Sequence, residues 1–161
     1  MYEEMDDVVR GVGQVCISAS SLEWSLAYCT SVLRCKDDDW FVKVFASPSQ
    51  PLKQFRKLTS AVAVQMPELR ADTEQLLATA EQLLAQRHRV VHSAMMGELD
   101  PDSRACEAWH AKTDAVWSVV PADLNSLARD LAQCAREVDA FGTAWEERAN
   151  RDDWPLLDVP G

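Results

Sequence analysis

The sequence predicts an all-α protein, an antiparallel bundle of four to five helices with a small β-hairpin inserted before the last long helix. Three observations predict this class. Apolar residues recur in alternating steps of three and four over three long segments, which is the period of a helix with one buried face. Short polar connections separate these segments and favour antiparallel neighbours. Before the last segment the period changes to that of short strands.

The first helical segment, residues 8–33, carries one apolar stripe over about seven turns. Gly11 and Gly13 weaken its beginning, because glycine is a poor helix former. An acidic run follows, in which Asp38 or Asp39 is expected to cap a short helix that ends near Phe45. The stripe consists of Val8, Val12, Val15, Ala19, Leu22, Leu26, Cys29 and Leu33.

Two further helices follow a break at residues 47–50. Pro51 is well placed to open a helix over residues 51–65 that buries Phe55, Leu58 and Val62. Pro67 begins the next helix, and the position after the apolar residues of its stripe is an arginine, Arg87. That stripe consists of Leu69, Thr73, Leu76, Ala80 and Leu83.

The hairpin is expected within and after residues 93–112, where Asp100-Pro101-Asp102-Ser103 is a strong turn signal and Trp109 and Trp117 suit strands. The last helix, residues 121–149, opens with Pro121. We expect residues 1–151 to form a single helical domain. We expect residues 152–161 to form an irregular tail that docks on the bundle or on a partner. The stripe of the last helix consists of Leu124, Leu127, Leu131, Cys134, Val138, Phe141 and Trp145.

Composition limits the function. The chain has 161 residues and a net charge of −10, which argues against a protein that coats nucleic acid without discrimination. Residues 40–97, however, carry seven basic and four acidic side chains, so a local anion site remains open. The acidic N-terminus lacks the layout of a signal peptide, no apolar run could cross a membrane, and the five cysteines form no C-x-x-C pair. We therefore expect a cytoplasmic protein with reduced thiols and no membrane contact.

Residues 86–93 concentrate the groups that could perform chemistry. Two of the three histidines, His88 and His92, lie four residues apart and share a helix face, and Arg87 and Arg89 accompany them. Imidazoles transfer protons near neutral pH and guanidiniums bind phosphate. Arg87 could lie at the end of the bundle with its head in water, or point into a cleft or subunit interface where an anion meets it.

Arg87 and His92 are about 140° apart on an ideal helix, so one straight helix cannot aim both at a single atom. Either the last turn unwinds, or copies from two subunits converge on the axis of a symmetric dimer.

Arg87-His88-Arg89-Val90-Val91-His92 resembles the R-x4–6-H motif of the HEPN superfamily, including a polar residue directly after the arginine. Members of that superfamily are helical bundles of about this length and are commonly dimeric. Many are toxins or abortive-infection ribonucleases that cleave RNA without a metal. Others are non-catalytic binding modules. The polar position is more often asparagine than histidine.

The resemblance implies that residues 1–151 are one HEPN-like domain, a homodimer with RNA as its substrate and no metal or other cofactor. The protein would be a toxin or antiphage defence effector, with an antitoxin or accessory protein as a further partner. Arg87 and His92 would be catalytic and His88 would take the supporting polar position, with Arg89 and Ser93 beside them as substrate-binding candidates. Cleavage would proceed by attack of the 2′-hydroxyl on the adjacent phosphate, with histidine as base or acid and arginine holding the phosphate.

Other interpretations stay open. His88 and His92 have the helical spacing of zinc ligands, with Cys106 or His110 as further ligands, although Arg87 and Arg89 would crowd a divalent cation. Ser93 beside His92 is not a catalytic triad. A cluster of three basic residues on the helix at 51–65 is either its wet face or the flank of an RNA path. The non-enzymatic alternative is a dimeric helical interaction module. The basic cluster consists of Lys53, Arg56 and Lys57.

Overall fold

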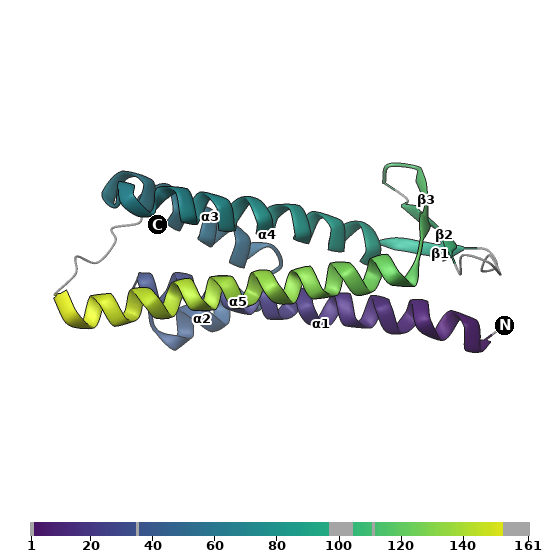
Figure 1. Ribbon diagram of the computed structural model, residues 1–161, viewed down its shortest axis with the longest axis horizontal. Helices are drawn as coiled ribbons and strands as arrows, with labels where there is room; N and C mark the ends of the chain where they lie inside the picture. The colour runs from purple at the N-terminus through teal and green to yellow at the C-terminus, as the bar shows by residue number, and fades with distance from the viewer. Residues whose placement is uncertain (1, 35, 97–104, 111, 153–161) are drawn as a thin grey trace. The chain divides into compact units, whose positions relative to one another are not determined.

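The computed structural model describes residues 2–34, 36–96, 105–110 and 112–152. Over these ranges the chain forms five α-helices, one 3-10 turn and three β-strands (Figure 1), which confirms the predicted helical bundle with a small β insertion before the last long helix. The helices are α1 (Tyr2–Leu33), α2 (Asp38–Phe45), α3 (Gln50–Gln65), α4 (Arg70–Val91) and α5 (Pro121–Asp152), and the 3-10 turn is Pro67–Leu69. The strands are β1 (Ser93–Met96), β2 (Cys106–His110) and β3 (Ala115–Val119).

The chain divides into two compact units. The first contains residues Met1–Ser20 and Gln82–Ala132, and therefore the end of α4 and the whole sheet. The second contains residues Ser21–Glu81 and Gln133–Gly161, and therefore α2 and α3. In the described part of the chain we find no helix with the length and apolarity that a bilayer span requires.

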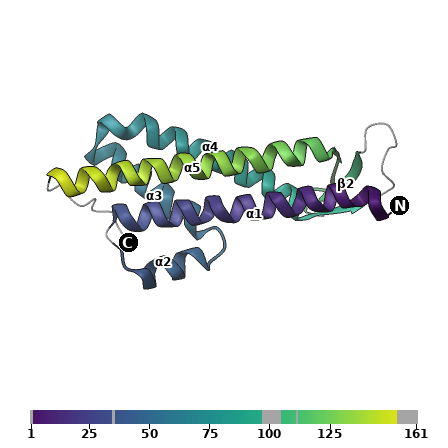
Figure 2. The ribbon, with the colours of Figure 1, turned by 60° about the horizontal axis from the view of Figure 1, so that its bottom comes forward.

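In the first unit, α1 and α5 approach each other closely at Gly11. A Cβ atom added to Gly11 would lie only 2.9 Å from Cβ of Leu124, so any larger residue would push the two helices apart. Figure 2 shows the first half of α1 beside the beginning of α5. Gly13 meets nothing within 4 Å. Close packing against α5 therefore explains why residue 11 is a glycine. The helix α1 begins at Tyr2 and continues through both Gly11 and Gly13.

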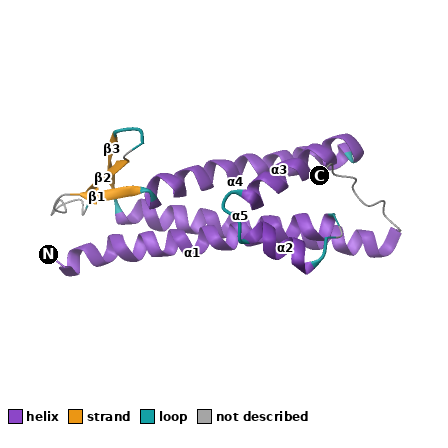
Figure 3. Ribbon diagram, turned by 180° about the vertical axis from the view of Figure 1, so that it is seen from behind, coloured by secondary structure: helices purple, strands orange, loops and turns teal. Residues whose placement is uncertain are grey.

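The sheet of the first unit is antiparallel with the strand order β1-β2-β3. The predicted antiparallel hairpin is present as β1 and β2, which flank the predicted turn residues 100–103, and β1 continues directly from the end of α4 (Figures 1 and 3). β3 pairs with β2 and adds a third strand. Trp109 and Trp117 lie in strands, as predicted. The predicted turn at residues 100–103 lies outside the described residues. One face of the sheet carries Ser93, Met95, Cys106, Ala108, His110, Ala115, Trp117 and Val119, because these residues alternate along paired strands.

The second unit buries the apolar stripes that the sequence predicts. Phe55, Leu58 and Val62 of α3 are fully buried, as are residues of α1 and α5 in this unit. Close packing recurs at Gly142, where an added Cβ would meet the Sγ atom of Cys29 at 3.4 Å. The other buried stripe residues are Leu22, Leu26, Cys29, Leu33, Thr73, Ala80, Cys134, Val138 and Trp145.

The cap of α2 differs from the prediction. Asp37, not Asp38 or Asp39, is the N-cap, and its carboxylate accepts a hydrogen bond from the backbone N–H of Trp40 at 2.8 Å. The helix begins one or two residues earlier than expected, so Asp38 and Asp39 occupy its first turn, where acidic groups complement the helix dipole. At the other end of the chain, α5 extends to Asp152, which the prediction placed in the tail. Residues 153–161 lie outside the described residues.

Candidate functional site

The candidate site lies at the end of α4, where the helix stays regular through its last turn. The backbone N–H of His92 donates to the carbonyl oxygen of His88 at 3.1 Å, which is the bond of a continuing α-helix. The last turn therefore does not unwind. Arg87 and His92 of one chain point to different sides of α4, about 140° apart.

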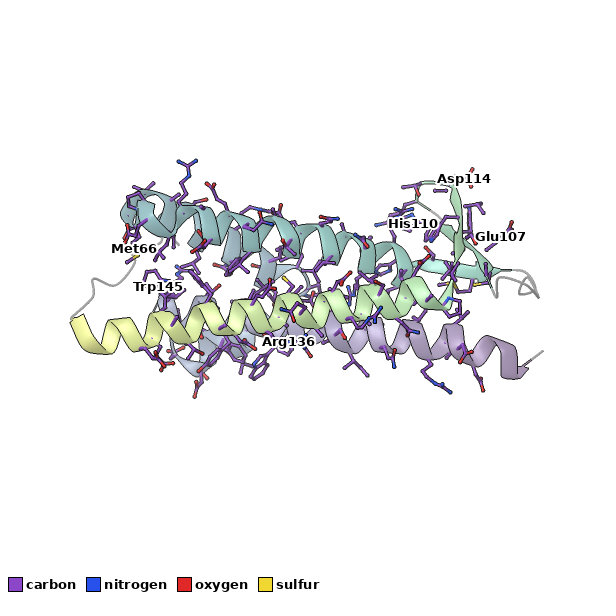
Figure 4. All side chains as sticks on the ribbon, viewed as in Figure 1. Met66, Glu107, His110, Asp114, Arg136 and Trp145 are labelled. Carbon is purple, nitrogen blue, oxygen red and sulfur yellow. The ribbon has the colours of Figure 1, made fainter. Side chains whose placement is uncertain are left out.

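All three histidines of the chain gather at this end of α4. The ring of His88 lies 4.3 Å from that of His92 and 6.0 Å from that of His110, measured between centroids. His88 and His92 are exposed, whereas His110 of β2 is buried. Figure 4 labels His110 on the sheet. Because β1 follows α4 and pairs with β2, Ser93 is opposite His110, and this register brings the third imidazole to the helix end.

The sequence suggested His110 only as a further zinc ligand, and not as a neighbour of His88 in a site without a metal. The pairing of β1 with β2 would have revealed it. The turn signal at residues 100–103 implies this pairing, because strands paired symmetrically about that turn place Ser93 opposite His110.

Electrostatics favour a neutral His88. Partial desolvation, followed by the positive charges of His92, His110, Lys112 and Arg87, lowers the pKa of His88 below its usual value of 6.5. The imidazole is therefore unprotonated at neutral pH and has a lone pair ready to accept a proton.

The turn between β2 and β3 fixes His110. Its Nδ1 atom is 3.0 Å from the hydroxyl of Thr113, a hydrogen bond that orients the ring. Asp114 in the same turn has a positive φ of 50°, and its carboxylate accepts a hydrogen bond from Nε1 of Trp109 at 2.9 Å. Asparagine and aspartate tolerate this backbone conformation better than most residues. Thr113 thus orients the ring of His110, and the hydrogen bond between Trp109 and Asp114 stabilises the same turn.

Arg87 is half-buried, and its Nε atom is buried without a hydrogen-bond partner among the described residues. A buried donor of a charged group that lacks an acceptor is costly, typically about 1–3 kcal/mol or more. The burial of Nε is inconsistent with the alternative in which the whole guanidinium of Arg87 lies in water. An anion or a carboxylate from another molecule would supply the missing acceptor.

The two substrate-binding candidates are also engaged. The guanidinium carbon of Arg89 lies 4.8 Å from the ring centroid of Trp117, within cation–π range. The hydroxyl of Ser93 donates to the carbonyl oxygen of Arg89, so it closes the end of α4 and is not aimed at an imidazole. Arg89 remains exposed and can reach a ligand, whereas Ser93 has a structural hydrogen bond.

The zinc alternative gains no support. In the part of the chain that the structure describes, no group of three or more His, Cys, Asp or Glu residues is arranged to hold a metal ion. Cys106 is buried, and its sulfur contacts Sδ of Met95 at 3.9 Å. Positive charge from Lys112 and Arg87 near His88 also disfavours a divalent cation.

The basic residues of α3 belong to the second unit. Arg56 forms an ion pair with Glu81, with its Nη2 atom 2.6 Å from the carboxylate, so its charge is already paired. Lys53 is exposed and Lys57 is half-buried. Whether the two lysines flank an RNA path stays a prediction.

Comparison of the chain with protein-family models, with curated proteins and with solved structures finds no match. The function must therefore be inferred from the chemistry at the end of α4.

Proposed function

We propose that the protein is a metal-independent endoribonuclease of the HEPN type. The observation that carries this proposal is the convergence of His88, His92 and His110 at the end of α4, beside Arg87. The arrangement offers the exposed imidazoles of His88 and His92, which are groups that exchange protons near neutral pH. It also offers the permanently charged guanidinium of Arg87, whose Nε donor has no acceptor among the described residues. These are the groups that RNA cleavage by its own 2′-hydroxyl requires.

Each group has a role in the proposed reaction. His88, which is neutral at pH 7, removes the proton of the 2′-hydroxyl, and the oxygen attacks the adjacent phosphorus. The bond from phosphorus to the 5′-oxygen breaks, and protonated His92 supplies the proton that this oxygen takes up. The guanidinium of Arg87 compensates the negative charge of the crowded phosphorane. The products are a 2′,3′-cyclic phosphate and a 5′-hydroxyl.

The proposal includes a homodimer. Because the helical hydrogen bonds of α4 continue to the N–H of His92, ideal helix geometry separates Arg87 and His92 of one chain by about 140°. A second copy is then the simplest source of the arginine that joins His92. The Nε atom of Arg87, which is buried and finds no hydrogen-bond partner in the described part of the chain, supports a location at an interface or against a bound anion. A toxin or defence role, with an antitoxin or accessory protein as partner, follows from the same proposal.

The test is cleavage of single-stranded and structured RNA in excess EDTA. We expect the wild type to leave cyclic phosphates, and His92→Ala and His88→Ala to lose about 10²–10⁴-fold in rate. Gln82→Ala, at an exposed position of α4, is the matched control and should cleave like the wild type. DNA, which lacks the 2′-hydroxyl, should not be cut. Equal cleavage by His92→Ala and wild type would exclude the proposal.

The second candidate function is a non-catalytic interaction module, and one observation favours it. The second unit exposes an aromatic cluster on α1 and α2, with Trp24 4.5 Å from Phe41 and 5.3 Å from Phe45. Trp24 is 48% exposed and Tyr28 is 46% exposed, which is unusual for such large side chains. If no RNA is cut and expression of the protein does not slow growth, a binding module becomes the better account.

A further inference from the structure

A small open pocket lies beside the histidines in the first unit. It measures about 170 Å³ and combines a floor of buried aliphatic side chains with polar groups at its mouth. Pockets for whole small molecules are usually about 300–1,000 Å³, so this one suits a single flat ring. Its lining consists of Gln86, Arg89, Val90, Trp117, Ser118, Val119, Asp123, Leu124 and Leu127.

The pocket and the histidine cluster both involve the end of α4 and the sheet: the histidines lie at the end of α4 and on β2, and the pocket is lined by α4, β3 and α5. His88 faces His110 while the next residue, Arg89, covers Trp117. His110 and Trp117 lie on one face of the sheet, because Trp117 pairs with Ala108, two residues before His110. On α4, Arg89 is only about 60° from His92. An RNA strand that has one phosphate at the histidines can therefore place an adjacent base in the pocket.

The lining matches a base better than a phosphate. Trp117 and the guanidinium of Arg89 form a stacking element of the kind that holds unpaired RNA bases. Asp123 brings a negative charge that repels phosphate, so the anionic part of a nucleotide stays with the histidines. Its backbone N–H donates to the carbonyl oxygen of Val120 at 3.0 Å, which fixes Asp123 in the first turn of α5.

The carboxylate also discriminates between bases. An ionised carboxylate only accepts hydrogen bonds, and its two oxygens suit two adjacent donors. Guanine presents such a pair, its N1–H and its 2-amino group. Adenine and cytosine place an acceptor next to their amino group, and uracil flanks its single N–H with two carbonyls.

We propose that this pocket is a nucleobase subsite that selects guanine in single-stranded RNA, with Asp123 as the specificity residue and Arg89 and Trp117 as the stacking element. The subsite deepens the ribonuclease proposal and rests on it for the choice of RNA as ligand. It predicts cleavage next to guanine in preference to other bases.

The test measures binding to five-nucleotide RNAs with 2′-O-methyl groups, which cannot be cleaved by their own hydroxyls. The central base is guanine, inosine, adenine, cytosine or uracil between flanking uridines, and inosine differs from guanosine only by the missing 2-amino group. Fluorescence anisotropy should give the guanine RNA at least about fivefold tighter binding than any other. Asp123→Asn should abolish this preference. Asp130→Asn, an exposed change of the same charge on the same helix, should keep it.

Each contrary result has a distinct meaning. Equal binding of all five RNAs, a preference that survives in Asp123→Asn, or no binding of any RNA would overturn the subsite. Cleavage of unmodified RNA, measured in parallel, tests the ribonuclease proposal separately. Cleavage without preference for guanine would support the ribonuclease proposal and contradict the subsite. Guanine-selective binding without cleavage would support the subsite and contradict the ribonuclease proposal.

Discussion

The imidazole rings of His88 and His92 lie 4.3 Å apart at the end of α4, with an angle of 46° between their planes. At this distance a proton on His92 disfavours a proton on His88, which is one cause of the lowered pKa of His88. Such a pair can accept a proton at one ring while the other ring donates one.

The lowered pKa of His88 predicts a pH dependence of stability. The unfolded chain protonates His88 near pH 6.5, whereas the folded chain resists protonation until a lower pH. The free energy of unfolding should therefore fall as the pH is lowered through 6.5 toward the folded pKa, and this contribution should be absent above 6.5. Denaturant unfolding of wild type and His88→Gln between pH 5 and 7.5 checks this, since only the wild type should show the added slope.

The same electrostatics predict the response to mutation of the neighbour. His92→Ala removes the largest named charge that opposes protonation of His88, so the pKa of His88 should rise toward 6.5. Titration of the His88 ring followed by NMR gives the midpoint directly. Lys112→Ala should raise it less, because that charge has a smaller effect. A midpoint unchanged in both variants would contradict the electrostatic coupling.

A composite site predicts complementation between inactive variants. If Arg87 of one subunit works with His92 of its partner, a mixed dimer of Arg87→Ala and His92→Ala subunits contains one intact site. Random mixing should then restore about a quarter of the wild-type cleavage rate. Each variant alone should stay inactive. No recovery after subunits have exchanged would place both residues in a site within one chain.

The two glycines of α1 predict opposite changes in stability. Gly11→Ala forces a Cβ against Leu124, and this overpacking should outweigh the better helix propensity, for a net loss of about 1 kcal/mol. Gly13→Ala meets open space and should stabilise the protein by about 0.5–1 kcal/mol. Thermal unfolding of both variants decides the matter, and a similar gain in both would refute the close approach of α1 and α5.

The cap of α2 predicts a difference between neighbouring aspartates. Asp37→Ala removes the acceptor of the Trp40 N–H and should cost about 1 kcal/mol. Asp39→Ala removes only a charge in the first turn and should cost about 0.3–1 kcal/mol at low salt. Chemical denaturation at low and high salt separates the two, because only the effect of Asp39 should fade with salt.

Helical periodicity predicted most of the fold. The alternating stripes of α1 and α5 located buried residues such as Leu22 and Leu131, because burial of one helix face imposes that period on the sequence. Boundaries were less predictable. Asp37, Asp38 and Asp39 are equally suitable caps by residue type, and only the backbone of Asp37 has the extended conformation that a cap needs.

The candidate site could be predicted only in part. The spacing of His88 and His92 fixed their shared face, since it depends on one helix alone. The arrival of His110 and the pairing of Arg89 with Trp117 depend on strand register, which brings together residues more than 20 positions apart. The turn signal at residues 100–103 implies the register of β1 with β2, whereas the five-residue strands β2 and β3 carry too little pattern to specify theirs.

The buried thiols provide built-in reporters of local opening. Burial and the nearby carboxylate of Asp139 raise the pKa of Cys29, and burial with Glu137 raises that of Cys134 to about 11, so neither thiol reacts while the second unit stays closed. Burial also raises the pKa of Cys106, so its thiol reports opening of the sheet in the first unit. Alkylation followed by mass spectrometry would therefore time the opening of each unit without any added label, with the half-buried Cys16 as an internal reference.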